Sequence, residues 1–469
     1  MKTLLAHPTG NQFFRQLGAA LHARGMLGLP ATCLNLNWNF NGTPARLLPA
    51  RARLELARRS FPEPWAEGMA TRPGRETARL LAQKLGWRSA TAHERGWCSV
   101  DAVYQDFDQW LARNLPLWRR EHGLDAVYAY EDGALAVFQA AKALGLRRAY
   151  DLPIAHWRLM RRLLAEEAER LPAWAPTLGG GTTDSPEKLA RKDLELELAD
   201  WVIVPSQFVA DSLPESCRSK QVIVAPFGSP DCGRRRTLRR GSGQAEDGEP
   251  FGVAQGRRRT EDGVEEPGGE CLGSRAGSGE FRNPQSAIQN RERPLRVLFA
   301  GSMGQRKGLG DLFAAMRLLG RDDVELVVMG GLMAPMEFYR HEFPGFVFEP
   351  GRPHDQVLSL MRTCDVLALP SIVEGRALVM QEAMSQGLPL IITPNTGGAD
   401  LIEEGRTGFL VPIRRPELIA EKIAWLADHR VETGEMGRLA QRKAEACTWA
   451  AYGETICAAL ARHQFKQSV

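Results

Sequence analysis

The chain has 469 residues, 43% of them hydrophobic and 25% charged, which is typical of a globular protein long enough for two or more domains. Its 60 Lys and Arg against 56 Asp and Glu leave a net charge of +4, too small to indicate a nucleic-acid partner. No apolar run reaches the roughly 20 residues that span a bilayer, and the first run stops at His7 and Pro8 before a secretory signal could form. We therefore expect a cytoplasmic protein. The eight cysteines contain no CxxC pair, which favours free thiols over disulfides or a structural zinc.

Short apolar runs alternate with helical patterns through the first half of the chain. We expect strands at KTLLAH (2–7), DAVYAY (125–130), RRAYDL (147–152) and DWVIVPS (200–206). We expect helices at ALAVFQAAKALGL (134–146) and KLARKDLELELA (188–199).

Residues 230–293 are rich in Gly, Arg, Glu and Ser and have almost no bulky apolar side chains. Such a segment buries too little surface to offset its ordering entropy, so we expect a disordered linker between domains 1–229 and 294–445. Its arginine clusters leave contact with nucleic acid or an anionic membrane open, but the interspersed acids favour a solvated linker. We expect no nucleic-acid partner, and a peripheral membrane contact has no further support.

The second half repeats the alternation of apolar runs and helical patterns. Strands are expected at 295–302, 324–331, 365–371, 388–395 and 407–413, and helices at 309–320, 354–363, 377–387 and 415–429. A last helix is expected within 446–469, where it could pack back on the first domain. Strands with few polar positions between helices predict an α/β protein with two doubly wound, parallel, Rossmann-like domains. Ligands of such sheets bind beyond the carboxyl ends of the strands.

The loop GSMGQRKGLG (301–310) follows one of these expected strands and precedes a helix. Its small residues let backbone amides approach an anion, the helix start adds a partial positive charge, and Arg306 and Lys307 add two cations. We expect a phosphate site here. The alternative is a plain strand-to-helix turn with solvated cations, since the spacing is not the Walker pattern.

The loop after the strand at 365–371 carries two carboxylates, Glu374 before a helix and Glu382 inside it. At about 1.5 Å of rise per residue the two lie roughly 12 Å apart, which suits a nucleotide sugar with its diphosphate at the helix start. Paired acids of glycoside hydrolases lie closer, about 5 to 9 Å apart. Arg376, beside them, is expected to be exposed. In the next loop, PNTGGAD (394–400), Gly398 allows backbone to approach the same ligand.

These motifs, in their order and spacing, resemble the donor domain of glycosyltransferase family 4, whose members are retaining enzymes with the GT-B fold. The similar stretches between Leu295 and Pro412 are FAGSMGQRKGLGDLFAAM, VVMGG, DVLALPSIVEGRALVMQEAMSQGLPLIITPNTGGADLI and GRTGFLVP. In the first half only ELADWVIVPSQFVADSL and VIVAPFGS are similar. The resemblance implies two domains facing across a cleft and a nucleotide-diphosphate sugar as donor.

The resemblance also implies roles for individual residues. Glu382 would hydrogen-bond the ribose hydroxyls, and Glu374 would face the donor sugar as a catalytic residue. Arg306 and Lys307 would neutralise the diphosphate. Backbone at four further positions would approach the donor: Gly375, Ala377, Leu378 and Gly398. Because these cations can stabilise the leaving group, no cofactor and no essential metal are expected.

The sequence departs from the family pattern at several positions. Ser302 stands where an arginine is frequent, so Arg306 would carry that charge. Arg376 and Ala377 replace an aromatic residue and a glycine, and Arg376 is either an additional phosphate contact or a surface side chain. Asp400 stands where a glutamate is usual.

The first half offers fewer candidate residues. Gly10 lies in AHPTGNQ, where the family tends to have a glycine loop near the donor phosphate and the acceptor. His156, in DLPIAHWR, resembles the family's cleft histidine, so we expect a catalytic role for it. Glu131 and Asp132 lie at another strand end. For both we favour a structural role in a turn or a helix cap over a role in the site, and Asp132 is a candidate helix cap.

We therefore expect a retaining glycosyltransferase that transfers a sugar from a nucleotide-diphosphate donor to an unidentified acceptor. A non-catalytic nucleotide-sugar-binding module and a nucleotide-sugar epimerase are alternatives with the same architecture. A phosphorylase is another, and it would need a cofactor bound to a lysine of the second domain.

Overall fold

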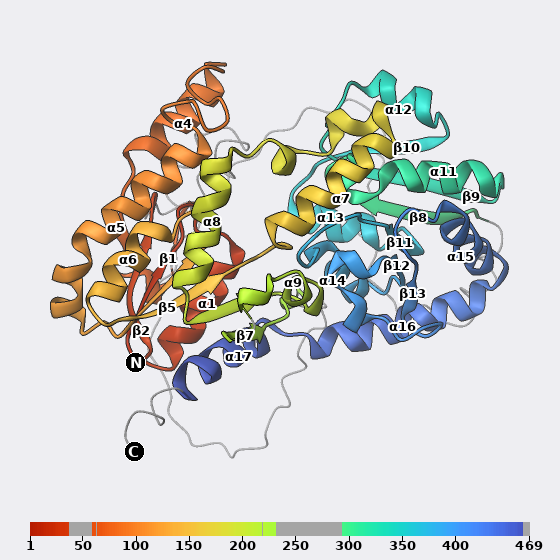
Figure 1. The fold of residues 1–469 in the computed structure, drawn as a ribbon. Helices are drawn as coiled ribbons and strands as arrows, with labels where there is room; N and C mark the ends of the chain where they lie inside the picture. Colours follow the sequence, from red (N-terminus) through yellow and green to blue (C-terminus); the bar gives the residue numbers. More distant parts are fainter. Residues whose placement is uncertain (37–58, 62, 218, 231–292, 463–469) are drawn as a thin grey trace, which may run out of the picture.

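The computed structural model describes residues 1–36, 59–61, 63–217, 219–230 and 293–462. The segment expected to be a disordered linker, 230–293, therefore lies almost entirely outside the described residues. The described residues form two parallel sheets with helices on both faces (Figure 1), as the alternation of strands and helices predicts.

The first sheet has seven strands in the order β3-β2-β1-β4-β5-β6-β7. Its strands are β1 (Thr3–Ala6), β2 (Leu27–Thr32), β3 (Ala70–Thr71), β4 (Ala126–Tyr130), β5 (Arg147–Asp151), β6 (Trp201–Val204) and β7 (Gln221–Val224). Its helices are α1 (Gln12–Ala23), α4 (Gly74–Lys84), α5 (Val100–His122), α6 (Leu135–Ala143), α7 (Trp157–Arg170), α8 (Pro186–Leu198) and α9 (Gln207–Asp211). The four strands expected in this half are present as β1, β4, β5 and β6.

The second sheet has six strands in the order β10-β9-β8-β11-β12-β13. Its strands are β8 (Leu295–Ala300), β9 (Val324–Gly330), β10 (Phe346–Pro350), β11 (Val366–Leu369), β12 (Leu390–Ile392) and β13 (Gly408–Leu410). The helices are α11 (Leu309–Leu319), α12 (Met336–Glu342), α13 (His354–Met361), α14 (Leu378–Ser385), α15 (Pro416–Asp428), α16 (Arg430–Ala446) and α17 (Trp449–Arg462).

The central strands are buried on both faces, which explains why they read as apolar runs in the sequence. All five residues of β4 and all four of β11 are buried. In the first half, two separate apolar clusters pack on opposite faces of the sheet, one around Leu4 and Val127 and the other around Leu5 and Tyr128. Such alternation of adjacent residues between two cores is the period-2 geometry of a strand.

One segment of the first half packs on the second half. We call α7 and the 3₁₀ helix η2 (Pro172–Thr177) the strap. Trp174 of the strap is buried in the core of the second domain, against Phe313, Phe338 and Tyr339. Figure 1 shows α7 among the helices of that domain, although the chain enters it from β5. The strap therefore joins the two halves at a second place besides the connection after β7.

The end of the chain returns to the first half. Helix α16 contacts α14 of the second domain, and α17 then packs along α1 (Figure 1). Tyr452 and Ile456 of α17 belong to the apolar cluster around Leu5 and Tyr128. Within the described ranges, no helix has both the length and the apolar character needed to cross a membrane.

Candidate functional site

Both sheets have a topological switch point, where neighbouring strands are followed by connections that run in opposite directions. In the second sheet it lies between β8 and β11, and in the first between β1 and β4. Doubly wound sheets bind ligands in the crevice beyond the strand ends at such points. The loops after these four strands are therefore the places where a site is expected.

At the second switch point, the loop after β8 meets the loop after β11. Glu374 Oε1 lies 2.8 Å from Arg306 Nη1 and 2.8 Å from Lys307 Nζ. The backbone is joined too, because Ile372 N–H donates to the Arg306 carbonyl at 2.9 Å. The structure thus brings three sequence-predicted site residues into one cluster, which we call the Glu374 cluster. Its carboxylate is the anion that the two cations hold.

Two glycines make the Glu374 cluster possible. At Gly301 (φ 149°) a Cβ would lie 2.7 Å from Lys307 Cδ, so a side chain there would displace the lysine stem. Gly308 (φ 77°), in the left-handed region, is the N-cap of α11, and a Cβ there would lie 2.0 Å from the Pro370 carbonyl oxygen. These close approaches bring the β8 loop onto the end of β11.

Gly375, the next predicted donor-binding residue, touches the first half of the chain. A Cβ at Gly375 would lie 1.7 Å from the Pro153 carbonyl oxygen, so the two backbones are in direct contact. The Gly375 carbonyl also accepts from Ser206 Oγ at 2.6 Å. Pro153 follows β5 and Ser206 follows β6, so two strand ends of the first sheet close on the donor loop of the second.

Arg376 is buried, not exposed as the sequence suggested. Its side chain is 0% exposed and forms a bidentate pair with Asp400, Nη1 to Oδ1 at 2.6 Å and Nη2 to Oδ2 at 3.0 Å. It also donates to the Gly397 carbonyl and to Gln381 Oε1 at 3.0 and 3.1 Å. The surface position considered for Arg376 is wrong, because the side chain is buried and donates to protein acceptors under the loop. The phosphate contact considered for it is not tested.

The remaining donor-side residues surround this loop. Ala377 precedes α14 and its N–H donates to the Thr396 carbonyl at 3.3 Å, while Leu378 is the first residue of the helix. Gly398 packs against the Met380 side chain, whereas the neighbouring Gly397 (φ 72°) lies against the Gly375 carbonyl. Roles of Ala377, Leu378 and Gly398 in donor binding stay predictions.

Glu382 lies further along α14, next to the start of α13. Its Oε1 is 3.1 Å from Nε2 of His354. Burial raises the pKa of Glu382, and the adjacent His354 partly opposes that shift. The contact of Glu382 with a ribose stays a prediction.

The strap holds the loop that carries Arg306 and Lys307. Gln305 N–H donates to Thr177 Oγ1 at 3.0 Å, and Gln305 Nε2 donates to Glu167 Oε2 and Asp311 Oδ2, both at 2.9 Å. Glu167 is fully buried and also binds Arg170 and Arg414, while Arg170 binds Asp311 at 2.8 Å. Sequence reasoning missed these residues, because a contact between residues 177 and 305 leaves no local pattern.

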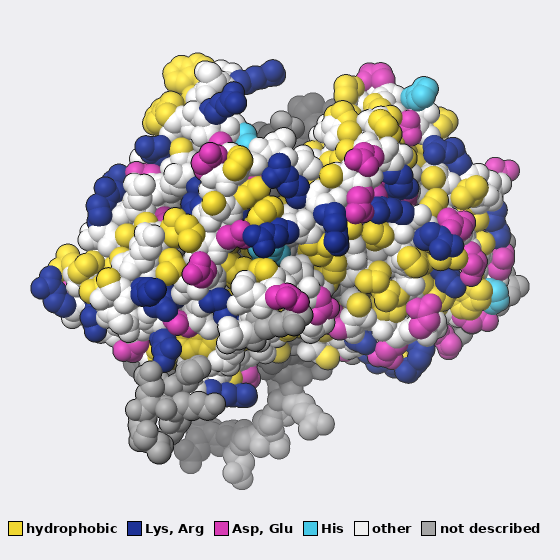
Figure 2. Space-filling model, viewed as in Figure 1, with side chains coloured by type: hydrophobic (Ala, Val, Ile, Leu, Met, Phe, Trp, Pro, Cys, Tyr) yellow, Lys and Arg dark blue, Asp and Glu magenta, His cyan; other side chains and the backbone are white. Residues whose placement is uncertain are grey.

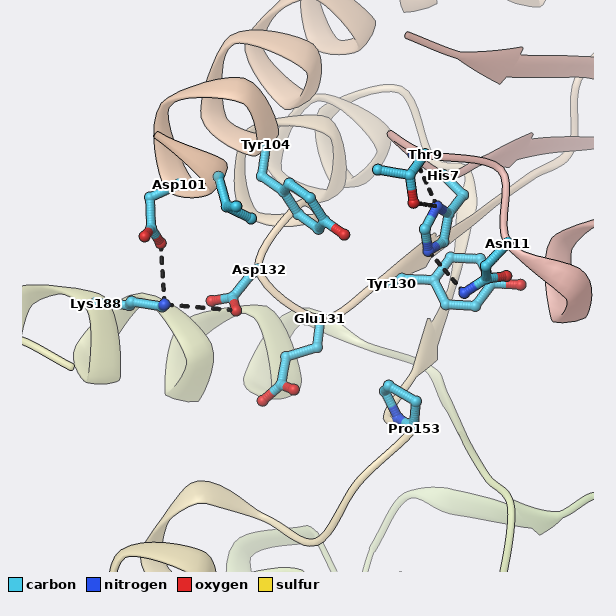
Figure 3. A pocket seen from close by; sticks show the side chains of 11 residues that line it. His7, Thr9, Asn11, Asp101, Tyr104, Tyr130, Glu131, Asp132, Pro153 and Lys188 are labelled. Carbon is cyan, nitrogen blue, oxygen red and sulfur yellow. Dashed lines mark hydrogen bonds and ion pairs between the residues drawn. The ribbon is translucent and has the colours of Figure 1, made fainter. Parts of the chain in front are cut away.

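A cavity of about 300 Å³ lies at the switch point of the first sheet. We call it the His7 pocket (Figure 3); its lining residues are His7, Thr9, Asn11, Val100, Asp101, Tyr104, Tyr130, Glu131, Asp132, Pro153 and Lys188. His7 comes directly after β1, and its Nδ1 accepts from the N–H groups of Thr9 and Gly10, each at 3.0 Å. Burial lowers the pKa of His7 to about 3, so the ring is neutral. Gly10 (φ 60°) turns the loop against the Phe61 ring.

The acids of the His7 pocket are paired with cations from α8. Glu131 lies 3.2 Å from Lys192 Nζ, and Asp132 lies 3.2 Å from Arg191 Nη2. The expectation that Asp132 caps a helix is wrong: the N-cap of α6 is Ala134, and Asp132 occupies a turn at φ 72°. Lys188 was missed in the sequence, although the spacing of KLARK on one helix could have suggested a basic face.

His156 precedes α7 and is buried. Its Nδ1 accepts from the Arg158 N–H at 3.4 Å as a helix cap, and its Nε2 lies 3.4 Å from Asp193 Oδ1. Burial lowers the pKa of His156 to about 4, although Asp193 opposes the shift. Both ring nitrogens thus face groups of the first half, and a catalytic role for His156 stays a prediction.

Within the described ranges, His93, Glu94 and Asp184 bring three potential metal-ligand atoms within 4.8 Å of one another. Lys188 Nζ lies 3.0 Å from the Asp184 carboxylate, so the lysine already supplies a positive charge at this group. The group comes from the segment before α5 and the segment before α8, away from the Glu374 cluster in the chain. That donor binding needs no metal stays an expectation.

The face of the molecule in Figure 2 carries charges of both signs over both halves. Figure 2 shows Lys and Arg interspersed with Asp and Glu over the face in view, with apolar side chains scattered among them. Mixed charges of this kind suit a solvated surface, and they agree with the small net charge of the chain.

Comparisons with known proteins agree with this architecture. The sucrose-phosphate synthase of Thermosynechococcus elongatus superposes over 100% of both chains with a TM-score of 0.58 at 15% identity. HepE of Anabaena, solved with UDP and glucose, superposes over 98% of this chain and 100% of its own, with a TM-score of 0.54 at 16% identity. The fold is therefore GT-B, the class of two facing Rossmann-like domains.

The sequence adds a family match in the second domain. Residues 294–429 match the family "Glycosyl transferases group 1". A D-inositol 3-phosphate glycosyltransferase of Paenarthrobacter aurescens is 29% identical over 181 residues, 36% of this chain and 44% of that protein. The putative colanic acid biosynthesis glycosyltransferase WcaL of Escherichia coli is 26% identical over 165 residues, 32% of this chain and 40% of its own. The chain thus spans less than half the length of the curated relatives it matches.

Proposed function

We propose that this protein is a retaining glycosyltransferase that moves a sugar from a nucleotide-diphosphate donor to an acceptor hydroxyl. The observation that carries the proposal is the Glu374 cluster, in which two cations from the β8 loop meet a carboxylate from the β11 loop, 2.8 Å from each. A diphosphate would replace the carboxylate as the partner of Arg306 and Lys307. Glu374 would then be free to contact the hydroxyls of the donor sugar.

The charges match the bond that is broken. Cleavage of the anomeric bond places negative charge on the leaving diphosphate and positive charge on the sugar ring. The negative charge on the diphosphate would be stabilised by Arg306, Lys307 and the start of α14. Glu374 would lie beside the positive charge on the sugar ring. The acceptor oxygen would bond to the anomeric carbon on the face that the diphosphate leaves. The acceptor proton would pass to the leaving phosphate oxygen, so atoms and charges balance.

Support for this donor class also comes from proteins of the same fold. HepE of Anabaena was solved in complex with UDP and glucose, and in a separate structure in complex with UDP-glucose. HepE shares the fold of this chain at low identity, so the base and the sugar of the donor are not carried over.

Product analysis separates the proposed activity from its rivals. The full-length chain is incubated with UDP-, GDP- and ADP-sugars and a panel of hydroxylated acceptors, and nucleoside diphosphate release is followed together with the sugar products. A glycosyltransferase releases the diphosphate and forms a glycoside with the donor's anomeric configuration. Conversion of the sugar without release would indicate an epimerase. Binding without either reaction across the panel would favour a non-catalytic module.

A further inference from the structure

The His7 pocket contains two hydrogen-bond donors that face each other. Nδ1 of His7 accepts two backbone N–H groups, so in the neutral ring the proton must be on Nε2. That Nε2–H group lies 3.0 Å from Nδ2 of Asn11. The Asn11 amide cannot turn its oxygen to the ring, because Oδ1 accepts the Phe14 N–H at 3.0 Å as the cap of α1. Two donors that face each other in this partly buried site, without an acceptor between them, do not satisfy each other.

An oxygen atom of a ligand would resolve this conflict. Placed beside both groups, it would accept one hydrogen bond from His7 Nε2 and one from Asn11 Nδ2. Figure 3 shows these side chains on one wall of the cavity and the carboxylates of Glu131 and Asp132 on another. Carboxylates accept hydrogen bonds and would take the protons of further hydroxyls. Donors on one side and acceptors on the other fit a compound that carries several hydroxyl groups.

The charges around the pocket disfavour an anionic ligand. Four carboxylates, of Asp101, Glu131, Asp132 and Asp184, face three cations, Lys188, Arg191 and Lys192. Lys188 lies 3.0 Å from both Asp101 and Asp184, Lys192 lies 3.2 Å from Glu131, and Arg191 lies 3.2 Å from Asp132. Every one of these cations already has a carboxylate partner, so a phosphate would meet a net negative charge.

The pocket also lies next to the donor loop. Pro153 lines the cavity, and its carbonyl oxygen touches the Cα of Gly375, the residue after Glu374. A volume of about 300 Å³ is at the lower end for small-ligand sites and suits a single ring. A ligand here would therefore be close to the sugar that Glu374 is proposed to contact.

We propose that the His7 pocket binds the acceptor as an uncharged polyhydroxyl ring, a sugar or cyclitol without a phosphate, through an oxygen held by His7 Nε2–H and Asn11 Nδ2–H. This inference rests on the glycosyl transfer proposed above, and it names the acceptor class for that reaction. The proposed acceptor carries no phosphate, and in this it differs from the inositol phosphate in the name of the Paenarthrobacter aurescens relative.

Ligand-observed NMR on the full-length chain tests the inference, because it detects weak binding. The neutral probes are glucose, mannose, galactose, N-acetylglucosamine and myo-inositol, and the charged probes are glucose 6-phosphate, mannose 6-phosphate and myo-inositol 1-phosphate. Each is measured with and without UDP, GDP or ADP. At least one neutral probe should bind, and more tightly than its phosphate. Tighter binding of the phosphate, or no neutral binding while a nucleoside diphosphate binds, would overturn the acceptor assignment and leave the proposed transferase standing.

The converse outcome is also informative. If neutral rings bind through Asn11 but none of the nucleoside diphosphates binds, the pocket assignment holds and the proposed transfer reaction fails.

Asn11→Asp isolates the donor pair. Aspartate still caps α1, and its second oxygen accepts from His7 Nε2–H, so the two facing donors are replaced by a donor and an acceptor. The ligand oxygen then loses the hydrogen bond that Asn11 Nδ2 would donate. We expect an unchanged or higher melting temperature and an about ten-fold weaker affinity for the neutral ring. Asn114→Asp, on α5 where Nδ2 bonds the Trp110 carbonyl, is the matched control and should leave the affinity unchanged. Equal ring affinity in Asn11→Asp and parent would contradict the proposed contact.

A second variant tests the charge argument. Asp132→Asn removes one carboxylate, and asparagine tolerates the left-handed backbone at this turn. We expect glucose 6-phosphate to bind more tightly to this variant than to the parent. If its affinity does not rise, the carboxylates are not what excludes phosphate.

Discussion

Arg376 and Asp400 are paired to each other although they are 24 residues apart, with Nη1 to Oδ1 at 2.6 Å and Nη2 to Oδ2 at 3.0 Å. Both residues stand where the sequence departs from the pattern of glycosyltransferase family 4. The structure therefore turns two separate departures into one feature: a buried guanidinium that ties the Glu374 loop to the glycine turn at Gly397.

Arg376 and Asp400 differ in burial, so we expect their substitutions to lower the free energy of unfolding by different amounts. Asp400 is 55% exposed and can be hydrated alone, whereas the Arg376 side chain is 0% exposed. We expect Asp400→Ala to lower the free energy of unfolding by about 2 to 4 kcal/mol, because it leaves a buried charge without its carboxylate. Arg376→Met should cost only about 1 to 2 kcal/mol. Urea unfolding of both variants measures this, and a larger loss for Arg376→Met would show that the guanidinium is hydrated without Asp400.

Glu382 should affect nucleoside binding and leave phosphate binding unchanged. If it contacts the ribose, Glu382→Ala should weaken the nucleoside diphosphate by about 1 to 2 kcal/mol and leave inorganic pyrophosphate affinity as in the parent. Calorimetric titration with both ligands provides the comparison. Equal losses for the two ligands would place Glu382 at the phosphates or in a structural role.

Thr177 is expected to position the phosphate loop from the other half of the chain. Thr177→Val removes the oxygen that accepts the Gln305 N–H, so the loop carrying Arg306 and Lys307 should lose order. We expect nucleoside diphosphate affinity to fall about three- to ten-fold. Thr183→Val, at an exposed hydroxyl bonded to the Gly180 carbonyl, is the matched control. An unchanged affinity in Thr177→Val would show that the loop is held without the strap.

Asp151 should make stability depend on pH. It is buried with Tyr128 Oη donating to Oδ2 at 2.5 Å, and burial raises the pKa of Asp151 from 3.8 to about 7. Between about pH 4 and 7 the folded protein therefore holds a proton that the unfolded chain has lost. The free energy of unfolding should fall in this window as pH rises, by up to about 1 kcal/mol per pH unit.

Asp151→Asn should lack this contribution. Because His7 and His156, whose pKa values are lowered, act in the opposite direction at acid pH, the useful quantity is the parent minus the variant at each pH. That difference should decrease from about pH 4 to 7. A constant difference would mean that Asp151 is ionised when folded.

The sequence predicts the parallel strands well where both faces are covered, as in β8, β9 and β11. It misses β2, where Pro30 and Gly28 interrupt the apolar pattern. Proline is tolerated there because, among the described residues, β3 pairs only with Ala31 and Thr32 of β2 and no strand pairs with Pro30 on that side. It also misses β10, an edge strand in which Phe346 is buried while Val347 and Pro350 are exposed.

The site residues also divide into those that the sequence predicts and those that it misses. Arg306, Lys307 and Glu374 follow strands that the sequence shows, so their meeting could be predicted from topology alone. The burial of Arg376 and the support from Thr177 could not, because each depends on a partner in another loop or another half of the chain. The His7 pocket combines residues at or after the ends of β1, β4 and β5 with residues of α5 and α8, and only its strand ends carried a signal in the sequence.

In the proposed reaction, Arg306 and Lys307 bind the donor diphosphate, and the Glu374 carboxylate takes its place when the ligand is absent. Titration of UDP, GDP and ADP by calorimetry into the parent, Lys307→Ala and Glu374→Gln tests it, with Lys422→Ala on α15 as the control. We expect the parent and the control to bind at least one of them equally. Lys307→Ala should bind about ten-fold or more weakly, and Glu374→Gln a few-fold more tightly because the competing carboxylate is gone. Equal affinities in the parent and all three variants, or no binding of any nucleoside diphosphate, would rule out a diphosphate site at Arg306 and Lys307.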